Sequence, residues 1–242
     1  MPLPVSGQEA IESLLNAIES RDLRAIEDAL TPDATWQNVP SPQADGRDAV
    51  LAMLAPIVTW SDEVRWDVTS AAYDGHRGWL ERVDRFVVAG DELAVRCNGV
   101  FEARDGRVAA VRDYVDLAEW RARAGPVLAA HAARPAIDVV RRHLDAVRRR
   151  DVVAMSADYA LGAELVRGDE THRGWRRIAE YFDSVPGRLG GRTLELGAPE
   201  PDGDRYVTVG WSIEGAASGR DRYEVGEGRI IRQTVELDGT DF

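Results

Sequence analysis

The stretch WLERVDRF, residues 79–86, carries a charged pair on a face that should be apolar. Its alternation is typical of a half-buried β-strand, in which side chains two residues apart share a face. One face then carries Leu80, Arg82, Asp84 and Phe86. Burying a charge costs free energy unless an opposite charge or hydrogen bonds accompany it. The pattern therefore predicts either a reactive site or a structural ion pair.

Asp113, in the later stretch VRDYVDL, is the candidate partner for this pair. Turn-forming stretches, AGDE and ARDG, lie between Asp84 and Asp113 and allow two hairpins. Such hairpins can bring the two carboxyl groups together with Arg82 between them. One arginine and two aspartates that share a proton are neutral overall, so the trio can be buried. We expect the two carboxyl groups to titrate as a coupled pair.

The bulk composition excludes several classes of function. The 242 residues are 44% hydrophobic and 30% charged, as in globular proteins that fold in water, and suffice for one large or two small domains. The net charge of −12 argues against nucleic-acid binding. The lone cysteine and four scattered histidines provide no metal-binding motif. Without a signal peptide or a long apolar run, we expect a cytoplasmic protein that is not membrane-bound.

The two halves of the chain have the same order of patterns. Residues 10–58 and 136–185 each predict an amphipathic helix, an Arg-Asp break, a short helix, a strand and a third helix. Strands with period-two patterning and turn-forming glycines then follow in both halves. Helices followed by an antiparallel meander predict an α+β class.

We therefore expect a tandem repeat of a small cone-shaped domain, in which a curved, mainly antiparallel sheet wraps around helices. The predicted domains cover residues 1–124 and 134–242. The Ala-rich stretch RARAGPVLAAHAARPA, with a glycine and two prolines, is the predicted linker.

Three stretches resemble the limonene-1,2-epoxide hydrolase family of the NTF2-like, or SnoaL-like, superfamily. They are WQNVPSPQADGRDAV, ERVDRF and GVFEARDGRVAAVRDYVDL, all in the first half. The family combines an Arg-x-Asp strand, a later Asp in an Arg-Asp-Tyr/Phe context, and an upstream Tyr-x-Asn. The matching residues here are Arg82, Asp84, Asp113, Trp36 and Asn38.

The resemblance implies a cofactor-independent epoxide hydrolase, since epoxide opening by water needs a base and an acid together. It implies that Asp113, with Asn38, activates water, that Asp84 protonates the epoxide oxygen, and that Arg82 bridges them. Trp36 stands where the family has a water-positioning tyrosine. An indole N–H donates a hydrogen bond but accepts none, so the water depends more on Asn38 and Asp113.

The pocket wall is predicted from strand phase and from the resemblance. Its candidate residues are Phe86, Val95, Cys97, Val115 and Trp120. For any single one of them, a simple core position is the favoured interpretation. Together, they imply a lipophilic small-molecule epoxide as the substrate.

The second half does not repeat the charged set. Aligning its last strand with that of the first half puts Val235 opposite Asp113, and the Arg-x-Asp strand has no clear counterpart. We therefore expect a degenerate domain with a structural role, as an intramolecular pseudo-dimer partner of the first. A homodimer of the whole chain is a further option. The alternative is an independent pocket in which Glu164 is a lone base.

Three other functions remain open for the first half. An epoxide-opening cyclase of polyether-type natural-product biosynthesis would use a substrate hydroxyl in place of water. A SnoaL-like or ketosteroid-isomerase-like cyclase or isomerase would need only a carboxylate base. In a non-catalytic small-molecule binding protein, the charged trio would be purely structural.

Overall fold

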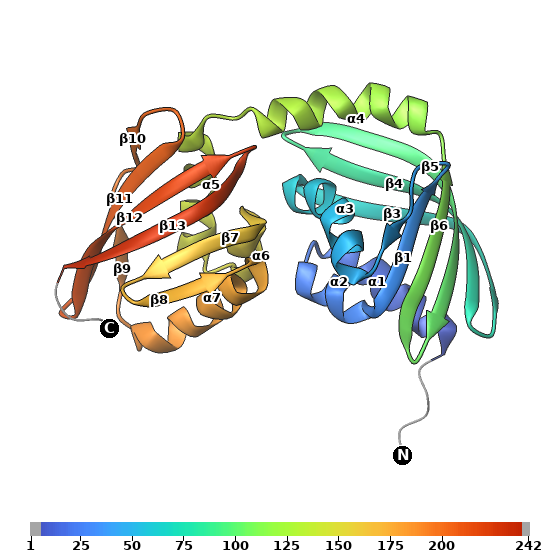
Figure 1. The fold of residues 1–242 in the computed structure, drawn as a ribbon, viewed down its shortest axis with the longest axis horizontal. Coiled ribbons are helices and arrows are strands. Elements are labelled where there is room, and N and C mark those ends of the chain that lie inside the picture. The colour runs from blue at the N-terminus through green and yellow to red at the C-terminus, as the bar shows by residue number, and fades with distance from the viewer. Residues whose placement is uncertain (1–5, 239–242) are drawn as a thin grey trace, which may run out of the picture. The chain divides into compact units, whose positions relative to one another are not determined.

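The structure, a computed structural model, describes residues 6–238 and divides into two compact α+β units. One unit ends at Ala129 and the other begins at Ala130 (Figure 1). The predicted domain limits at residues 1 and 242 lie outside the described residues. Within residues 6–238, no helix is long and apolar enough to cross a membrane.

The first unit is a curved six-stranded sheet with helices on its concave side (Figure 1). The strand order is β2-β1-β6-β5-β4-β3, and only β1 and β6 are parallel. The elements are α1 (Gly7–Glu19), α2 (Leu23–Ala29), β1 (Leu30–Val39), β2 (Ala44–Asp45), α3 (Arg47–Trp60), β3 (Glu63–Asp74), β4 (Arg77–Val88), β5 (Asp91–Arg104), β6 (Arg107–Val115) and α4 (Leu117–Ala132), which continues past the unit boundary at Ala129.

The second unit repeats this order of elements, as the sequence predicts. Its sheet runs β10-β11-β12-β13-β7-β8, with β9 also paired to β11, and its one parallel pair is β7 with β13. The elements are α5 (Ala136–Arg149), α6 (Val152–Ala157), β7 (Tyr159–Arg167), β8 (Glu170–Arg173), α7 (Trp175–Leu189), β9 (Leu194–Leu196), β10 (Glu200–Asp202), β11 (Tyr206–Ile213), β12 (Ala217–Gly226) and β13 (Arg229–Asp238). The tandem α+β prediction is confirmed.

The repeated Arg-Asp dipeptide separates the first two helices of each unit in the same way. Arg21 and Arg150 have φ angles of 61° and 57°, in the left-handed region where a helix ends. Asp22 and Asp151 then cap the next helix, and their carboxylates accept hydrogen bonds from its first backbone N–H groups. A two-residue signal therefore both ends one helix and begins the next.

The strand phase that predicted Trp120 on the pocket wall does not extend beyond Val115, where β6 ends. The Asp116 carboxylate accepts hydrogen bonds from the backbone N–H groups of Ala118 and Glu119, which starts helix α4. Trp120 therefore lies on a helix. The predicted linker is also helical over most of its length, because α4 continues to Ala132.

Candidate active site

Strand β4 turns the predicted charged face inward. Leu80, Arg82, Asp84 and Phe86 are all buried, while the residues between them are more exposed. The alternation of the sequence thus identified the face correctly. The buried charges of Arg82 and Asp84 therefore need opposite charges or hydrogen bonds from other parts of the unit.

Arg82 joins two carboxyl groups. Its Nε donates to Asp84 Oδ1 at 2.7 Å, and its Nη2 lies 3.2 Å from Asp84 Oδ2. The same Nη2 lies 2.9 Å from Asp113 Oδ2. The three residues that the sequence singled out are therefore in direct contact, with the guanidinium between the carboxyl groups.

Two aromatic rings enclose the guanidinium. The Arg82 Cζ lies 4.2 Å from the ring centroid of Trp66 and 5.4 Å from that of Phe101. The arginine side chain has no exposed surface. Cation–π attraction adds to the ion pairs, most strongly where water is excluded.

Gly99 allows Arg82 and Asp113 to meet across strand β5. Gly99 pairs with Leu80 on β4 and with Asp113 on β6. A Cβ atom at position 99 would lie 2.2 Å from Arg82 Nη1 and 2.8 Å from Asp113 Oδ1. The side chains of β4 and β6 thus occupy the space that a residue on β5 would otherwise fill.

Trp36 holds Asp113 from the neighbouring strand. Its indole Nε1–H donates to Asp113 Oδ2 at 3.1 Å, and Trp36 is almost fully buried. The indole therefore orients the carboxylate, at the position where the resemblance implies a water-positioning tyrosine in the family. Asp113 Oδ1 makes no hydrogen bond to any described residue.

Burial and charge together shift the pKa values of Asp84 and Arg82. Burial raises the pKa of Asp84 to about 6, with Arg82 opposing the shift and the charge of Asp113 adding to it. Burial also works against the charge of Arg82, but the two aspartates outweigh it and raise the pKa of the guanidinium. Asp84 thus keeps its proton to a higher pH than an exposed aspartate does.

Both carboxyl groups reach a cavity of about 260 Å³, while Arg82 lies behind them. The five predicted wall residues, Phe86, Val95, Cys97, Val115 and Trp120, all line this cavity. The rings of Phe86 and Trp120 meet edge to face, with centroids 5.7 Å apart. The wall is thus apolar apart from its carboxyl end.

Asn38 also lines the cavity, opposite Asp113 in the parallel pairing of β1 and β6. Its Nδ2 lies 3.9 Å from Met53 Sδ, and it makes no hydrogen bond to Asp113 in the described structure. Asn38 and Asp113 thus face the same space without touching each other.

The sequence analysis missed several contributors to the site. Gly99 could have been suspected, because a glycine inside a strand often marks a close approach of other groups. Trp66 had no such signal, since its place depends on the register of β3. The contribution of α3, through Met53, Leu54 and Ile57, was also missed. Among the described residues, no group of His, Cys, Asp or Glu could hold a metal ion.

Comparisons with known proteins agree on the first unit. Residues 5–122 match the family model of the limonene-1,2-epoxide hydrolase catalytic domain. The epoxide hydrolase EphG of Mycobacterium tuberculosis is 28% identical over 110 residues, which is 45% of this chain and 72% of that protein.

The first unit is similar to the limonene-1,2-epoxide hydrolase catalytic domain. The predicted resemblance is therefore confirmed for this half of the chain, which we call the hydrolase-like unit.

Solved structures with similar folds include an LEH-like epoxide hydrolase of M. tuberculosis. It is 24% identical, covers 50% of this chain and 91% of its own, and has a TM-score of 0.44. A putative SnoaL-like polyketide cyclase from Jannaschia sp. CCS1 is 16% identical, covers 52% and 96%, and has a TM-score of 0.43.

The second unit does not repeat the charged trio of the hydrolase-like unit. Val235 pairs with Asp221 and Arg167, as Asp113 pairs with Gly99 and Asn38. When the two sheets are matched by this register, Arg82 corresponds to Trp211 and Asp84 corresponds to Ile213. Asp113 corresponds to Val235. The predicted loss of the trio follows from this register.

The suggestion that Glu164 is a lone base in a second pocket is wrong. Glu164 alternates with the buried residues of β7, so it points away from the core. Its carboxylate pairs with Arg173 at 3.3 Å and lies 3.7 Å from Arg232. A one-residue step along a strand reverses the face, which the sequence could not resolve.

We expect Gly99→Ala to destabilise the protein by about 1–3 kcal/mol, because the new methyl group overlaps Arg82 and Asp113. Urea unfolding of the variant measures this change. Gly210→Ala is the control, since Gly210 is also a strand glycine but has open space around its Cβ position. Equal unfolding midpoints for wild type and Gly99→Ala would contradict the proposed close packing.

Proposed function

We propose that the hydrolase-like unit opens a lipophilic epoxide by the one-step attack of water. Asp113 is the base, Asp84 is the acid, and Arg82 is the bridge that positions both. The observation that carries this proposal is the pair of carboxyl groups, joined through Arg82, at the polar end of an apolar cavity.

The reaction needs two carboxyl groups in opposite protonation states. Water, hydrogen-bonded to Asp113 and Asn38, loses a proton to Asp113 as its oxygen bonds to one epoxide carbon. The bond from that carbon to the epoxide oxygen breaks, and the oxygen takes the proton of Asp84. The product is a diol, and proton exchange with solvent restores the two carboxyl groups.

The geometry supports these roles in two respects. The raised pKa of Asp84, due mainly to burial, favours its acid form. Asp113 has one carboxylate oxygen, Oδ1, that accepts no hydrogen bond from a described residue, whereas Arg82 and Trp36 both contact Oδ2. The residues thus differ in environment as an acid and a base must.

The apolar wall supports a lipophilic substrate. Aromatic and aliphatic side chains from β4, β5, α3 and α4 surround the space next to the carboxyl groups. A cavity of about 260 Å³ suits a compact molecule, near the lower end for small-molecule sites. An epoxide with a hydrocarbon skeleton would leave few polar groups unpaired there.

Trp36 favours a second candidate reaction, the opening of an epoxide by a hydroxyl group of the same substrate. The indole N–H is already used by Asp113 and cannot accept a hydrogen bond from water. Incubation with lipophilic epoxides in ¹⁸O-labelled water separates the two reactions by mass spectrometry. We expect a diol that contains one ¹⁸O atom, which indicates hydrolysis. A cyclic ether without label would instead indicate cyclisation.

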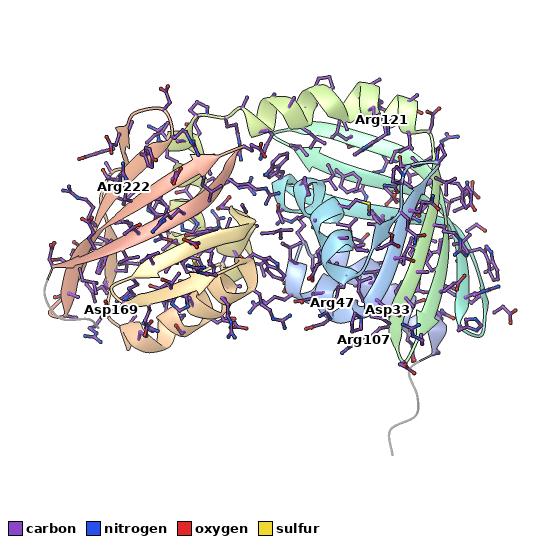
Figure 2. All side chains as sticks on the ribbon, in the orientation of Figure 1. Asp33, Arg47, Arg107, Arg121, Asp169 and Arg222 are labelled. Carbon is purple, nitrogen blue, oxygen red and sulfur yellow. The ribbon has the colours of Figure 1, made fainter. Side chains whose placement is uncertain are left out.

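Asp113→Asn should lower kcat/KM for epoxide opening by about 10²–10⁴-fold, because an amide cannot accept the proton of water. Asp33→Asn is the control, since Asp33 is an exposed residue of β1 (labelled in Figure 2). Initial rates of diol formation give both values, with thermal melting to verify folding. Activity of Asp113→Asn within twofold of wild type would refute the assignment of the base.

The pH profile of kcat/KM tests the acid. Since Asp84 has a raised pKa of about 6, it holds its proton below this pH and loses it above. The acid form is the reactive one, so we expect the rate to fall as pH rises from 6 to 8. A rate that instead increases over this interval would contradict Asp84 as the proton donor.

A further inference from the structure

The second unit contains a cavity of its own, of about 320 Å³. Aromatic rings dominate its inner part, where His143 lies 5.6 Å from Phe182 and 5.7 Å from Tyr223 between ring centroids. Leucine and valine side chains of α5, α7 and β9 extend the wall. The space is thus mainly apolar, like the cavity of the hydrolase-like unit.

Of the residues that the structure describes, Asp221 on β12 supplies the single carboxylate that lines this cavity. Trp211 Nε1 donates to Asp221 Oδ1 at 2.9 Å. Tyr223 Oη and Gln233 Nε2 donate to Asp221 Oδ2 at 3.0 and 2.8 Å. Three neutral donors therefore hold the carboxylate, where the hydrolase-like unit uses an arginine.

The donors are fixed by their own surroundings. Gln233 Oε1 accepts a hydrogen bond from the hydroxyl group of Tyr159, which is fully buried. Gly219 makes room for the indole, since a Cβ atom there would lie 2.6 Å from Trp211 Cζ2. The network is thus built into the core before any ligand arrives.

Asp221 remains accessible from the cavity, although it lies deep in the unit. It keeps part of its surface, while its neighbour Tyr223 on the same face is fully buried. The next residue, Arg222, points to the outer face of β12 (labelled in Figure 2) and pairs with Asp202. A carboxylate oxygen can accept two hydrogen bonds, so Oδ1 has one position left beside that used by Trp211.

We propose that the second unit is a binding site for a mainly apolar small molecule with a hydroxyl group, which Asp221 holds at the inner end of the cavity. The arrangement of one carboxylate, three fixed donors and an aromatic wall carries this inference. It is independent of the reaction proposed for the hydrolase-like unit.

A hydroxyl group is the anchor that fits best. Burial raises the pKa of Asp221, against the three hydrogen bonds that stabilise its charge. A hydroxyl group can donate to the ionised carboxylate and accept from the protonated one, so it suits either form. An amine would meet Arg148, Arg150 and Arg167 on the same wall, and their positive charges disfavour it.

Two tryptophan side chains provide matched reporters for the test. The indole N–H of Trp211 contacts Asp221, and that of Trp36 contacts Asp113 in the other unit. In a ¹H–¹⁵N spectrum of the full chain, the loss of a signal in Trp211→Phe or Trp36→Phe assigns each indole. Titration with 2-naphthol is then compared with titration with its methyl ether, 2-methoxynaphthalene.

We expect 2-naphthol to shift the Trp211 signal saturably, and the methyl ether to bind at least about tenfold weaker, a loss of about 1.4 kcal/mol. Asp221→Asn should weaken 2-naphthol binding by a similar factor. Val185→Trp should abolish it, because this partly exposed wall residue can carry a larger side chain into the cavity. If Asp221→Asn does not fold, the binding of 2-naphthol to Val185→Trp tests the proposal.

Three results would overturn the proposal. One is a shift of the Trp36 signal alone, which would put the probe only in the hydrolase-like unit. Another is equal affinity for 2-naphthol and its methyl ether. The third is unchanged binding in the folded variants. Epoxide opening by the same preparations is measured separately, so failure of either proposal is distinguishable from failure of the other.

Discussion

The hydrolase-like unit depends on the neutralisation of one buried arginine. Arg82 has no exposed side-chain surface, and it lies against two aromatic rings that cannot replace its hydration. Its charge is tolerable only because Asp84 and Asp113 both contact it. Removing one partner from a buried pair costs about 3–5 kcal/mol, since the remaining charge is left without compensation. The glycine on β5 leaves the space in which Arg82 and Asp113 meet this requirement.

The sequence could predict the faces of strands but not the contacts between them. Period-two alternation placed Arg82 and Asp84 on the inner face of β4 because a strand has only two faces. Gly99 was overlooked, because its role appears only when Leu80, Gly99 and Asp113 are known to lie in one row. Trp120 was predicted on the cavity wall but on the wrong kind of element, because the Asp116 cap ends the strand pattern within one residue.

The two units share a backbone plan but differ in where glycine stands on the central strand. In the hydrolase-like unit, Gly99 leaves room for Arg82 and Asp113 above it. In the second unit, the position that matches Gly99 carries Asp221, and the glycine lies two residues earlier, at Gly219, under the ring of Trp211. A side chain from a neighbouring strand can lie over the central strand only where a glycine has no Cβ atom. The two-residue shift of the glycine therefore changes which polar side chain reaches the cavity.

This difference limits the chemistry that each unit can perform. Concerted opening of an epoxide needs one carboxyl group to take a proton while another supplies one, and a shared cation keeps the two close. Among the described residues, no second carboxyl group lines the cavity of Asp221, and the contacts of Asp221 are three neutral donors. It can hold a hydroxyl group, but it lacks the partner for acid–base catalysis of this kind. The repeat of one fold therefore provides two cavities, and among the described residues only the first has the two carboxyl groups that the proposed reaction requires.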